Sequence, residues 1–413
     1  MKTLNIFKIF LVFAAFLFVS CSKDDSKTES EGDNPLKSLS LSSQEQGFVN
    51  TGNAFALEFL DRINQHSDDS FIISPLSMQY LLGMMLNGAQ EETQAQIIKV
   101  LGYGTGQTEA VNKYCLSLMN QLSGLDKKTK IHFANAAFAD KAFNISNHFK
   151  TSLKDYYKAE VSNKSFSDPK TLEEINSWCK KQTNGNIPQI LDCLSKDDVL
   201  LILNTLYFNS TWKNPFDVQK TTTRPFYMGD GGSRNVSMMA KQEVLAYAEN
   251  EIFSVVNLPY GNSSFQMYIF LPKEEKTVVD ITGSFKNVEN FLTSLSWKAC
   301  DVDMWLPRFE TKYDIELNHI LSSMGIPDAF DKNKANFKSI SDKENLCLSL
   351  VKQCATIKVD EEGTVAAVVS TGKWYPIALD YPSVQFHADH PFVYMIIERS
   401  SQAILFAGKY TGK

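Results

Sequence analysis

Several motifs that mark common enzyme classes are missing from this chain. It has no G-x-S-x-G nucleophile turn, no H-E-x-x-H zinc motif and no G-x-x-x-x-G-K phosphate loop. None of its six histidines sits in a catalytic pattern, and His387 and His390 flank a strand-like stretch beside Pro391, which favours a local structural role. We therefore predict that the protein is not an enzyme; a surface hydrolase without familiar motifs is a competing interpretation.

Paired cysteines and runs of positive charge are equally scarce. Apart from Cys21, the six cysteines are widely and irregularly spaced without a C-x-x-C pair, so we expect no metal site and no cofactor. Most of them should be small buried residues. The formal net charge is -6 and no long tract of lysine and arginine occurs, which argues against nucleic acid as a partner.

What the chain does contain is the composition of a globular protein with a sizeable core. Hydrophobic residues make up 43% of the sequence and charged residues 21%. No internal repeat of the kind that builds solenoids or propellers is present. No polar linker divides residues 45–413, which predicts one large domain over that range.

The N-terminus has the pattern of a targeting segment. Lys2 and Lys8 accompany an apolar run over residues 9–19 that is too short to span a membrane comfortably. Phe18-Val19-Ser20-Cys21 then resembles a bacterial lipobox, which implies a signal peptide over residues 1–20 and lipid attachment at Cys21. Residues 21–44 are polar and should form a flexible tether. A plain secretory signal followed by a chance cysteine is the alternative.

The lipobox resemblance also implies a location. We expect an exported outer-membrane lipoprotein, held to the membrane through the lipid on Cys21. Residues 22–25, Ser-Lys-Asp-Asp, resemble the surface-export tag of some Gram-negative lipoproteins, so the cell surface is the expected face.

The spacing of apolar residues changes along the predicted domain. Helical spacing occurs early, at residues 55–63, 77–87, 93–101 and 172–179. Strand-like patterns follow at residues 199–208, 265–271, 302–309, 356–359, 392–397 and 403–410, the last two as a closing hairpin. The run 199–208 is apolar apart from Asn204 and Thr205, which suits a strand buried on both faces. The sequence thus predicts an α+β fold.

The segment from Val359 to Asp380 combines features that seldom occur together. An acidic turn at residues 360–363 leads into residues 364–371, which are small or β-branched and free of charge and proline. These continue directly into residues 372–378, which have the pattern of an exposed loop. Such a segment could lie outside a sheet or be inserted into one; an ordinary edge strand followed by a turn is the alternative.

A series of motifs in one family's order runs from Phe71 to Phe392. The motifs are Phe71-Ile72-Ile73-Ser74-Pro75-Leu76-Ser77, Asn87-Gly88-Ala89, Ile175-Asn176-Ser177-Trp178, Thr183-Asn184-Gly185-Asn186-Ile187, Leu203-Asn204-Thr205-Leu206-Tyr207-Phe208, Leu258-Pro259-Tyr260, Leu306-Pro307-Arg308-Phe309 and His390-Pro391-Phe392. Together with Gly363-Thr364-Val365-Ala366-Ala367, they resemble the serpin family of serine protease inhibitors over nearly all of residues 45–413. The resemblance implies the serpin fold, with a helix-rich N-terminal part, three β-sheets and an exposed reactive loop.

The resemblance also implies a single-use mechanism. A protease attacks a bait bond in the loop and forms an acyl-enzyme, and the freed hinge then inserts into the main sheet as a new strand and carries the protease with it. About fourteen residues at roughly 3.3 Å each give a strand of roughly 45 Å. We expect a monomeric suicide inhibitor in covalent complex with a serine protease, or with a related cysteine protease. A non-inhibitory serpin that serves as a binding or chaperone module, and is cleaved as a plain substrate, is the alternative.

The composition of the hinge favours the inhibitory form. By resemblance the hinge consists of Glu361, Gly363, Thr364, Val365, Ala366 and Ala367. The period of two along a strand places Thr364, Ala366, Val368 and Ser370 on one face, and all four side chains are small enough to be buried. No charge or proline interrupts the run, so we expect insertion to proceed.

The family's loop length places the bait bond at Ile377–Ala378, or one bond later at Ala378–Leu379. Cleavage at Lys373–Trp374 would suit a trypsin-like enzyme but would leave a short inserting strand. Ile377 favours an elastase-like protease, and a chymotrypsin-like protease is left open.

The resemblance assigns sheet-opening roles to six further residues: Ser74, Ser77, Asn204, Gln353, Trp212 and Arg308. Gln353 stands where the family often has a histidine, so any pH sensitivity from that histidine is lost, although an amide can still bridge polar groups. Arg308 is expected to pair with Glu361. No basic cluster resembles the heparin-binding helix of some serpins, so no glycosaminoglycan partner is predicted.

Overall fold

The computed structural model describes residues 34–195, 198–285, 291–341, 346–364 and 381–413. The chain divides into two compact units, Met1–Pro35 and Leu36–Lys413, and the description below concerns the second unit. The predicted lipidation site, the later hinge residues and the predicted bait bond lie outside the described residues; they are Cys21, Val365, Ala366, Ala367, Ile377 and Ala378.

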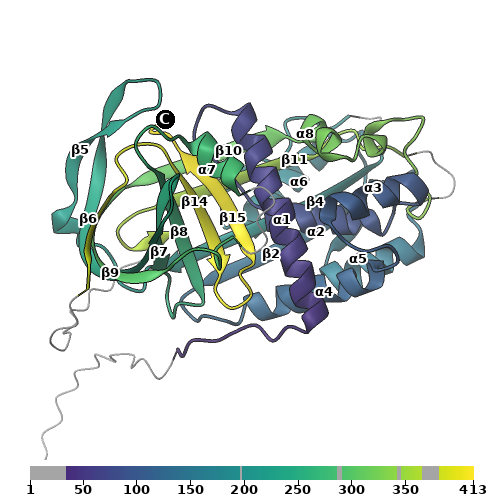
Figure 1. The fold of residues 1–413 in the computed structure, drawn as a ribbon. Helices are drawn as coiled ribbons and strands as arrows, with labels where there is room; N and C mark the ends of the chain where they lie inside the picture. Colours follow the sequence, from purple (N-terminus) through teal and green to yellow (C-terminus); the bar gives the residue numbers. More distant parts are fainter. Residues whose placement is uncertain (1–33, 196–197, 286–290, 342–345, 365–380) are drawn as a thin grey trace, which may run out of the picture. The chain divides into compact units, whose positions relative to one another are not determined.

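Helices predominate in the first half of the unit (Figure 1). They are α1 (Ser43–His66), α2 (Pro75–Leu86), α3 (Glu91–Leu101), α4 (Thr108–Leu122), α5 (Asn147–Tyr157) and α6 (Pro169–Gln182), with the short α7 (Val278–Ser284) and α8 (Asn318–Met324) later in the chain. Their ends follow local chemistry: Ser42 and Glu45 form a capping box on α1, Ser74 caps α2, and Gly102 closes α3 in a left-handed conformation. Each of the four predicted helical stretches is confirmed.

Six strands form one mixed sheet in the order β10-β11-β12-β4-β2-β3. Their bounds are β10 (Phe309–Glu316), β11 (Lys352–Val359), β12 (Gly363–Thr364), β4 (Leu200–Thr211), β2 (Lys130–Asp140) and β3 (Glu160–Lys164). The long strand β4 is covered on both faces, as its sequence predicts. Leu201 and Leu203 pack with α6 through Ile175 and Cys179, while α2 contacts β4 from the other side.

The remaining strands form a nine-stranded sheet in the order β1-β15-β14-β8-β7-β6-β9-β13, with β5 also paired to β6. Their bounds are β1 (Phe71–Ile73), β5 (Thr222–Tyr227), β6 (Ser233–Glu249), β7 (Phe253–Pro259), β8 (Phe265–Pro272), β9 (Lys298–Pro307), β13 (Ser383–His387), β14 (Phe392–Glu398) and β15 (Ile404–Tyr410). The predicted closing hairpin is β14 and β15. The described strands therefore join into two sheets where three were expected, because β6 pairs with β9 along most of its length and with β7 at its end.

Some residues of the predicted tether, which was expected to end at residue 44, contact the domain. Leu39 and Leu41 pack against the core, and the Leu39 amide donates to the Ser400 hydroxyl at 2.8 Å. These leucines interrupt an otherwise polar stretch and have apolar surface to bury. Within the described residues, no helix is both long and apolar enough to cross a membrane. The six cysteines after Cys21 are all free thiols.

Candidate functional site

In the six-stranded sheet, the two-residue strand β12 fills only one end of the space between β4 and β11. Strand β4 pairs with β2 along ten positions, but its other edge pairs with β12 only at Ser210 and Thr211. Strand β11 pairs with β10 at eight positions and with β12 only at Val359. Among the described residues, the rest of both facing edges has no strand partner. We call this stretch, from residue 200 to 209 of β4 and the facing part of β11, the gap.

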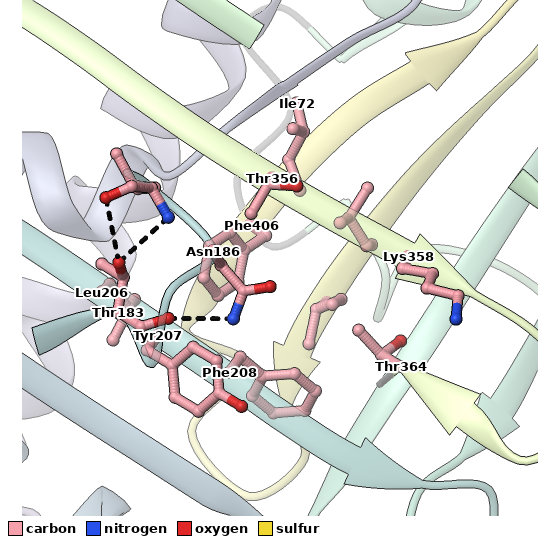
Figure 2. Close-up of a pocket in the computed structure, with 13 residues that line it drawn as sticks. Ile72, Thr183, Asn186, Leu206, Tyr207, Phe208, Thr356, Lys358, Thr364 and Phe406 are labelled. Carbon is pink, nitrogen blue, oxygen red and sulfur yellow. Dashed lines mark hydrogen bonds between the residues drawn. The ribbon is translucent and has the colours of Figure 1, made fainter. Parts of the chain in front are cut away.

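Two small cavities lie along the gap. The first, about 30 Å³, lies beside Thr364 and is bounded by residues 206–208 of β4 and 356–358 of β11 (Figure 2). Ile72, Ile396 and Phe406 line it from the nine-stranded sheet, and Thr183, Asn186 and Ile187 from the segment that follows α6. The second, about 70 Å³, lies at the far end, between residues 200–204 of β4 and residues 351–353 at the start of β11. The gap is thus lined mainly by apolar side chains and leads away from β12.

The turn that enters β12 is built from the predicted acidic residues. The Asp360 carboxylate accepts hydrogen bonds from the amides of Glu362 and Gly363, at 3.1 and 3.3 Å. Gly363 has a φ of +153°, and a Cβ there would lie 2.2 Å from the Ser210 carbonyl oxygen. The turn therefore requires glycine at residue 363, because any side chain would collide with the backbone of β4.

A pair of stacked aromatic residues lies against Thr364 of β12. Trp212 and Tyr260 stack with their ring centroids 4.4 Å apart, and the Tyr260 hydroxyl lies 2.7 Å from the Thr364 hydroxyl. Trp212 also donates from its indole nitrogen to the Asp360 carbonyl at 2.9 Å, and from its amide to the Glu362 carbonyl at 2.7 Å. Thr364 is only 2% exposed, so the first residue of the predicted inserting face already lies inside the sheet.

The structure brings Arg308 and Glu361 together next to this turn. The Arg308 Nε atom donates to the Glu361 carboxylate at 2.6 Å, and Thr221 donates to the other oxygen. Burial alone raises the pKa of Glu361, but the hydrogen bonds from Arg308 and Thr221 outweigh it, so the pKa lies below its ordinary value. The arginine side chain is 44% exposed and that of the glutamate 4%, so solvent screens the pair from the arginine side only.

The serine, asparagine and glutamine residues predicted to form a polar cluster beneath the sheet make hydrogen bonds that involve α2, β4 and β11. Ser77 donates to the Asn204 side-chain oxygen, and Asn204 donates to Asn135 of β2 at 2.5 Å. Gln353 bonds both backbone groups of Ser74: it accepts from the amide at 3.1 Å and donates to the carbonyl at 2.9 Å. Strands β4 and β11 are therefore each tied to the start of α2.

Three contributors to the site were not predicted: Tyr260, Asn135 and Thr221. Tyr260 is part of the motif Leu258-Pro259-Tyr260 that supports the family resemblance. Its contact with Thr364 could not be predicted, because it depends on the approach of the end of β7 to the end of β4. Asn135 is a buried polar residue within the otherwise apolar run 133–139 of β2, which is a usable signal. Thr221 lies in a short connection, and nothing in its local sequence marks it.

A sheet in which one strand is begun through a glycine turn, with no further partner among the described residues, is the arrangement that the serpin resemblance implies. The family model described as Serpin (serine protease inhibitor) matches residues 50–412. The chain is 28% identical to Serpin B10 of Bos taurus, over 87% of this chain and 97% of that protein, and 30% identical to Serpin B6 of Macaca fascicularis, over 86% and 97%.

The fold comparison agrees with the sequence comparison. The native-state crystal structure of the thermophilic serpin tengpin superposes with a TM-score of 0.80 at 29% identity, and the match covers 92% of this chain and 97% of that one. The chain belongs to the serpin family. The family is typically non-enzymatic, which agrees with the absence of catalytic motifs in the sequence.

Proposed function

We propose that this protein is a suicide inhibitor of serine proteases, possessing a reactive loop that inserts into the gap after cleavage. The observation that carries the proposal is the pairing of Gly363 and Thr364 with β4. These two residues start a strand between β4 and β11, and the remaining facing edges of β4 and β11 have no strand partner among the described residues. Completing the strand would add ladder hydrogen bonds on both sides, each worth about 1 kcal/mol net.

The observed register predicts where each loop residue would go. Antiparallel pairing of Thr364 with Ser210 and Val359, continued along the chain, sets Ala366 between Phe208 and Ile357. These two partners line the first cavity, and an alanine side chain is small enough to be buried there. The same register sets Ser370 opposite Asn204 and Gln353, so a hydroxyl would reach the polar cluster rather than the apolar part of the gap.

The register also supports the predicted bait bond. Residue 374 would lie opposite Leu200, the first residue of β4, leaving Tyr375, Pro376 and Ile377 beyond the strand. Cleavage at Ile377–Ala378 therefore frees a segment long enough to fill the gap. Cleavage at Lys373–Trp374 would end the new strand one residue short of Leu200. Ile377 makes an elastase-like protease the proposed target, with chymotrypsin-like and cysteine proteases as further candidates.

The location of the inhibitor is part of the proposal. The lipobox-like sequence at Cys21 supports an exported lipoprotein anchored in the outer membrane, with its domain facing the outside. A protease inhibitor in that place would meet proteases from outside the cell first. Labelling with a radioactive fatty acid tests the anchor: wild type should incorporate the label and Cys21→Ser should not.

The inhibitory function is tested by mixing the domain from Leu36 onward with elastase, chymotrypsin and trypsin. We expect a band on a denaturing gel at the summed mass of inhibitor and elastase, and a released peptide that begins at Ala378. Ile377→Arg is the matched variant, and it should transfer complex formation from elastase to trypsin. Clean cleavage without a complex in both proteins would instead show a non-inhibitory serpin that is only a substrate.

A further inference from the structure

A buried carboxylate lies in the connection between α4 and β2. It belongs to Asp126, which is 4% exposed. One of its oxygens accepts a hydrogen bond from the Lys128 amide at 2.9 Å, and the other accepts from the Thr129 hydroxyl at 2.7 Å and from the Asn262 amide at 3.3 Å. Hydrogen bonds to a carboxylate are stronger than those between neutral groups. The Asp126 side chain therefore holds together three backbone segments' worth of donors, two from its own connection and one from the turn between β7 and β8.

The bond to Thr129 connects this carboxylate to β4. The Thr129 hydroxyl lies 2.7 Å from the Ser210 hydroxyl. Because a hydroxyl has one hydrogen to donate, and that of Thr129 is donated to the carboxylate, Ser210 is the donor in this second bond. Ser210 is fully buried and is the residue of β4 that pairs with Thr364 of β12. Asp126 is thus two hydrogen bonds away from the β4 residue opposite Thr364.

The bond to Asn262 connects the same carboxylate to the turn that follows Tyr260. The Asn262 side chain also donates to the Leu125 carbonyl at 2.8 Å, so the turn is bonded to two successive residues of the connection. Between Tyr260 and Asn262, Gly261 has a φ of +40°, and a Cβ there would collide with the Asp126 carboxylate. The turn therefore requires glycine at residue 261, because it packs directly against the carboxylate.

We propose that Asp126 is a positioning residue that keeps β12 docked in the six-stranded sheet. Thr364 pairs with Ser210 on β4, and its hydroxyl lies 2.7 Å from that of Tyr260. Asp126 restrains both of these neighbours through the two routes described above, so its loss should loosen both contacts of β12. The consequence for protease trapping rests on the proposed function, since it assumes that insertion starts from β12. The docking of β12 itself can be measured on the intact protein without any protease.

The test follows hydrogen exchange over residues 360–364 of the intact protein by mass spectrometry. Asp126→Ala should raise the exchange rate there about tenfold, the factor expected when one hydrogen bond to a charged group is lost. Asp126→Asn should stay within about threefold of wild type, because an amide oxygen turned toward Thr129 and Asn262 still accepts from both. Glu398→Ala is the matched control: it removes a buried carboxylate that accepts four hydrogen bonds in the turn between β14 and β15. It should lower the thermal midpoint and leave exchange over residues 360–364 unchanged.

A second variant provides the answer if Asp126→Ala does not fold. Thr129→Val has nearly the same shape as the wild type and breaks only the route to Ser210, so it should raise exchange about fivefold, which corresponds to one neutral hydrogen bond. Both variants should also shift the reaction with elastase from covalent complex toward cleaved inhibitor.

The outcomes separate the positioning role from the inhibitor proposal. Unchanged exchange in Asp126→Ala and Thr129→Val, or an equal rise in Glu398→Ala, would overturn the positioning role while leaving the inhibitor proposal standing. Faster exchange in Asp126→Ala and Thr129→Val alone, with no covalent complex formed by the wild type, would support the positioning role and refute the inhibitor.

Discussion

Replacing Thr364 by arginine should convert the inhibitor into a substrate. The Thr364 side chain is 2% exposed and its hydroxyl lies 2.7 Å from that of Tyr260, which is stacked on Trp212. An arginine at this position would have to bury its charge against the aromatic pair or withdraw the hinge from the sheet. Because β12 would be the first part of the inserting strand in the proposed mechanism, the change should act at the step that starts insertion.

The size of the effect follows from the register. Extending β12 from Thr364 to the level of Leu200 adds ten residues, 365 to 374, and therefore favours insertion by about 10 kcal/mol if each adds one hydrogen bond. Burying an unpaired charge costs several kcal/mol, so the inserted state stays accessible. If about 2.7 kcal/mol of that cost enters the barrier, insertion slows roughly 100-fold. The acyl-enzyme then has time to hydrolyse, and the protease is released.

The assay compares the amount of covalent complex with the amount of cleaved inhibitor for Thr364→Arg and Thr364→Ser. The serine variant keeps a small side chain with a hydroxyl and should form complex like the wild type. The arginine variant should be cleaved at the same bond at a similar rate, with little complex. A complex yield equal to that of wild type for Thr364→Arg would refute the reasoning, because it would show that residue 364 need not be buried for insertion.

Two further predictions concern the turn before β12. Gly363→Ala places a methyl group 2.2 Å from the Ser210 carbonyl oxygen, so β12 should leave the sheet. We expect a loss of inhibition and faster proteolysis within residues 360–364, with the cleavage sites identified by mass spectrometry. For Glu361, the pKa in the folded protein is lowered, so its contribution to stability is fully present above the unfolded value near 4.5 and is lost as pH falls through the folded value. Glu361→Gln should therefore flatten the dependence of the thermal midpoint on pH below about 4.5, and an unchanged slope would contradict the assignment.

Local chemistry made much of this fold predictable. The helices α1, α3 and α6 have clear apolar periodicity, α2 is apolar and buried on all sides, and all four have recognisable caps. Strand β4 is a long apolar run between polar segments. The hinge turn was predictable too, because aspartate and glycine occupy the positions where a tight turn needs a side-chain acceptor and a residue without Cβ. In each case the determining interaction lies within a few residues of the chain.

Features that depend on distant segments were harder to predict. The stretch 302–309 was expected to be one strand, but the chain changes sheet at Arg308: β9 pairs with β6, and β10 pairs with β11. Nothing in the local pattern marks that change. Strand β6 was not predicted, because its 17 residues alternate irregularly between exposed and buried as it changes partners. The contacts of Asp192 and Lys352 join positions 160 residues apart and have no signature in either segment.

The arrangement of the gap fixes the order in which its restraints would be released. Insertion continues from Thr364, so the turn held by Trp212 and the Arg308–Glu361 pair is the first contact affected. Six residues later the new strand would reach Asn204, where the polar cluster ties β4 to α2. Substitutions at the turn should therefore decide whether insertion begins, which is why loss of inhibition is expected for Thr364→Arg.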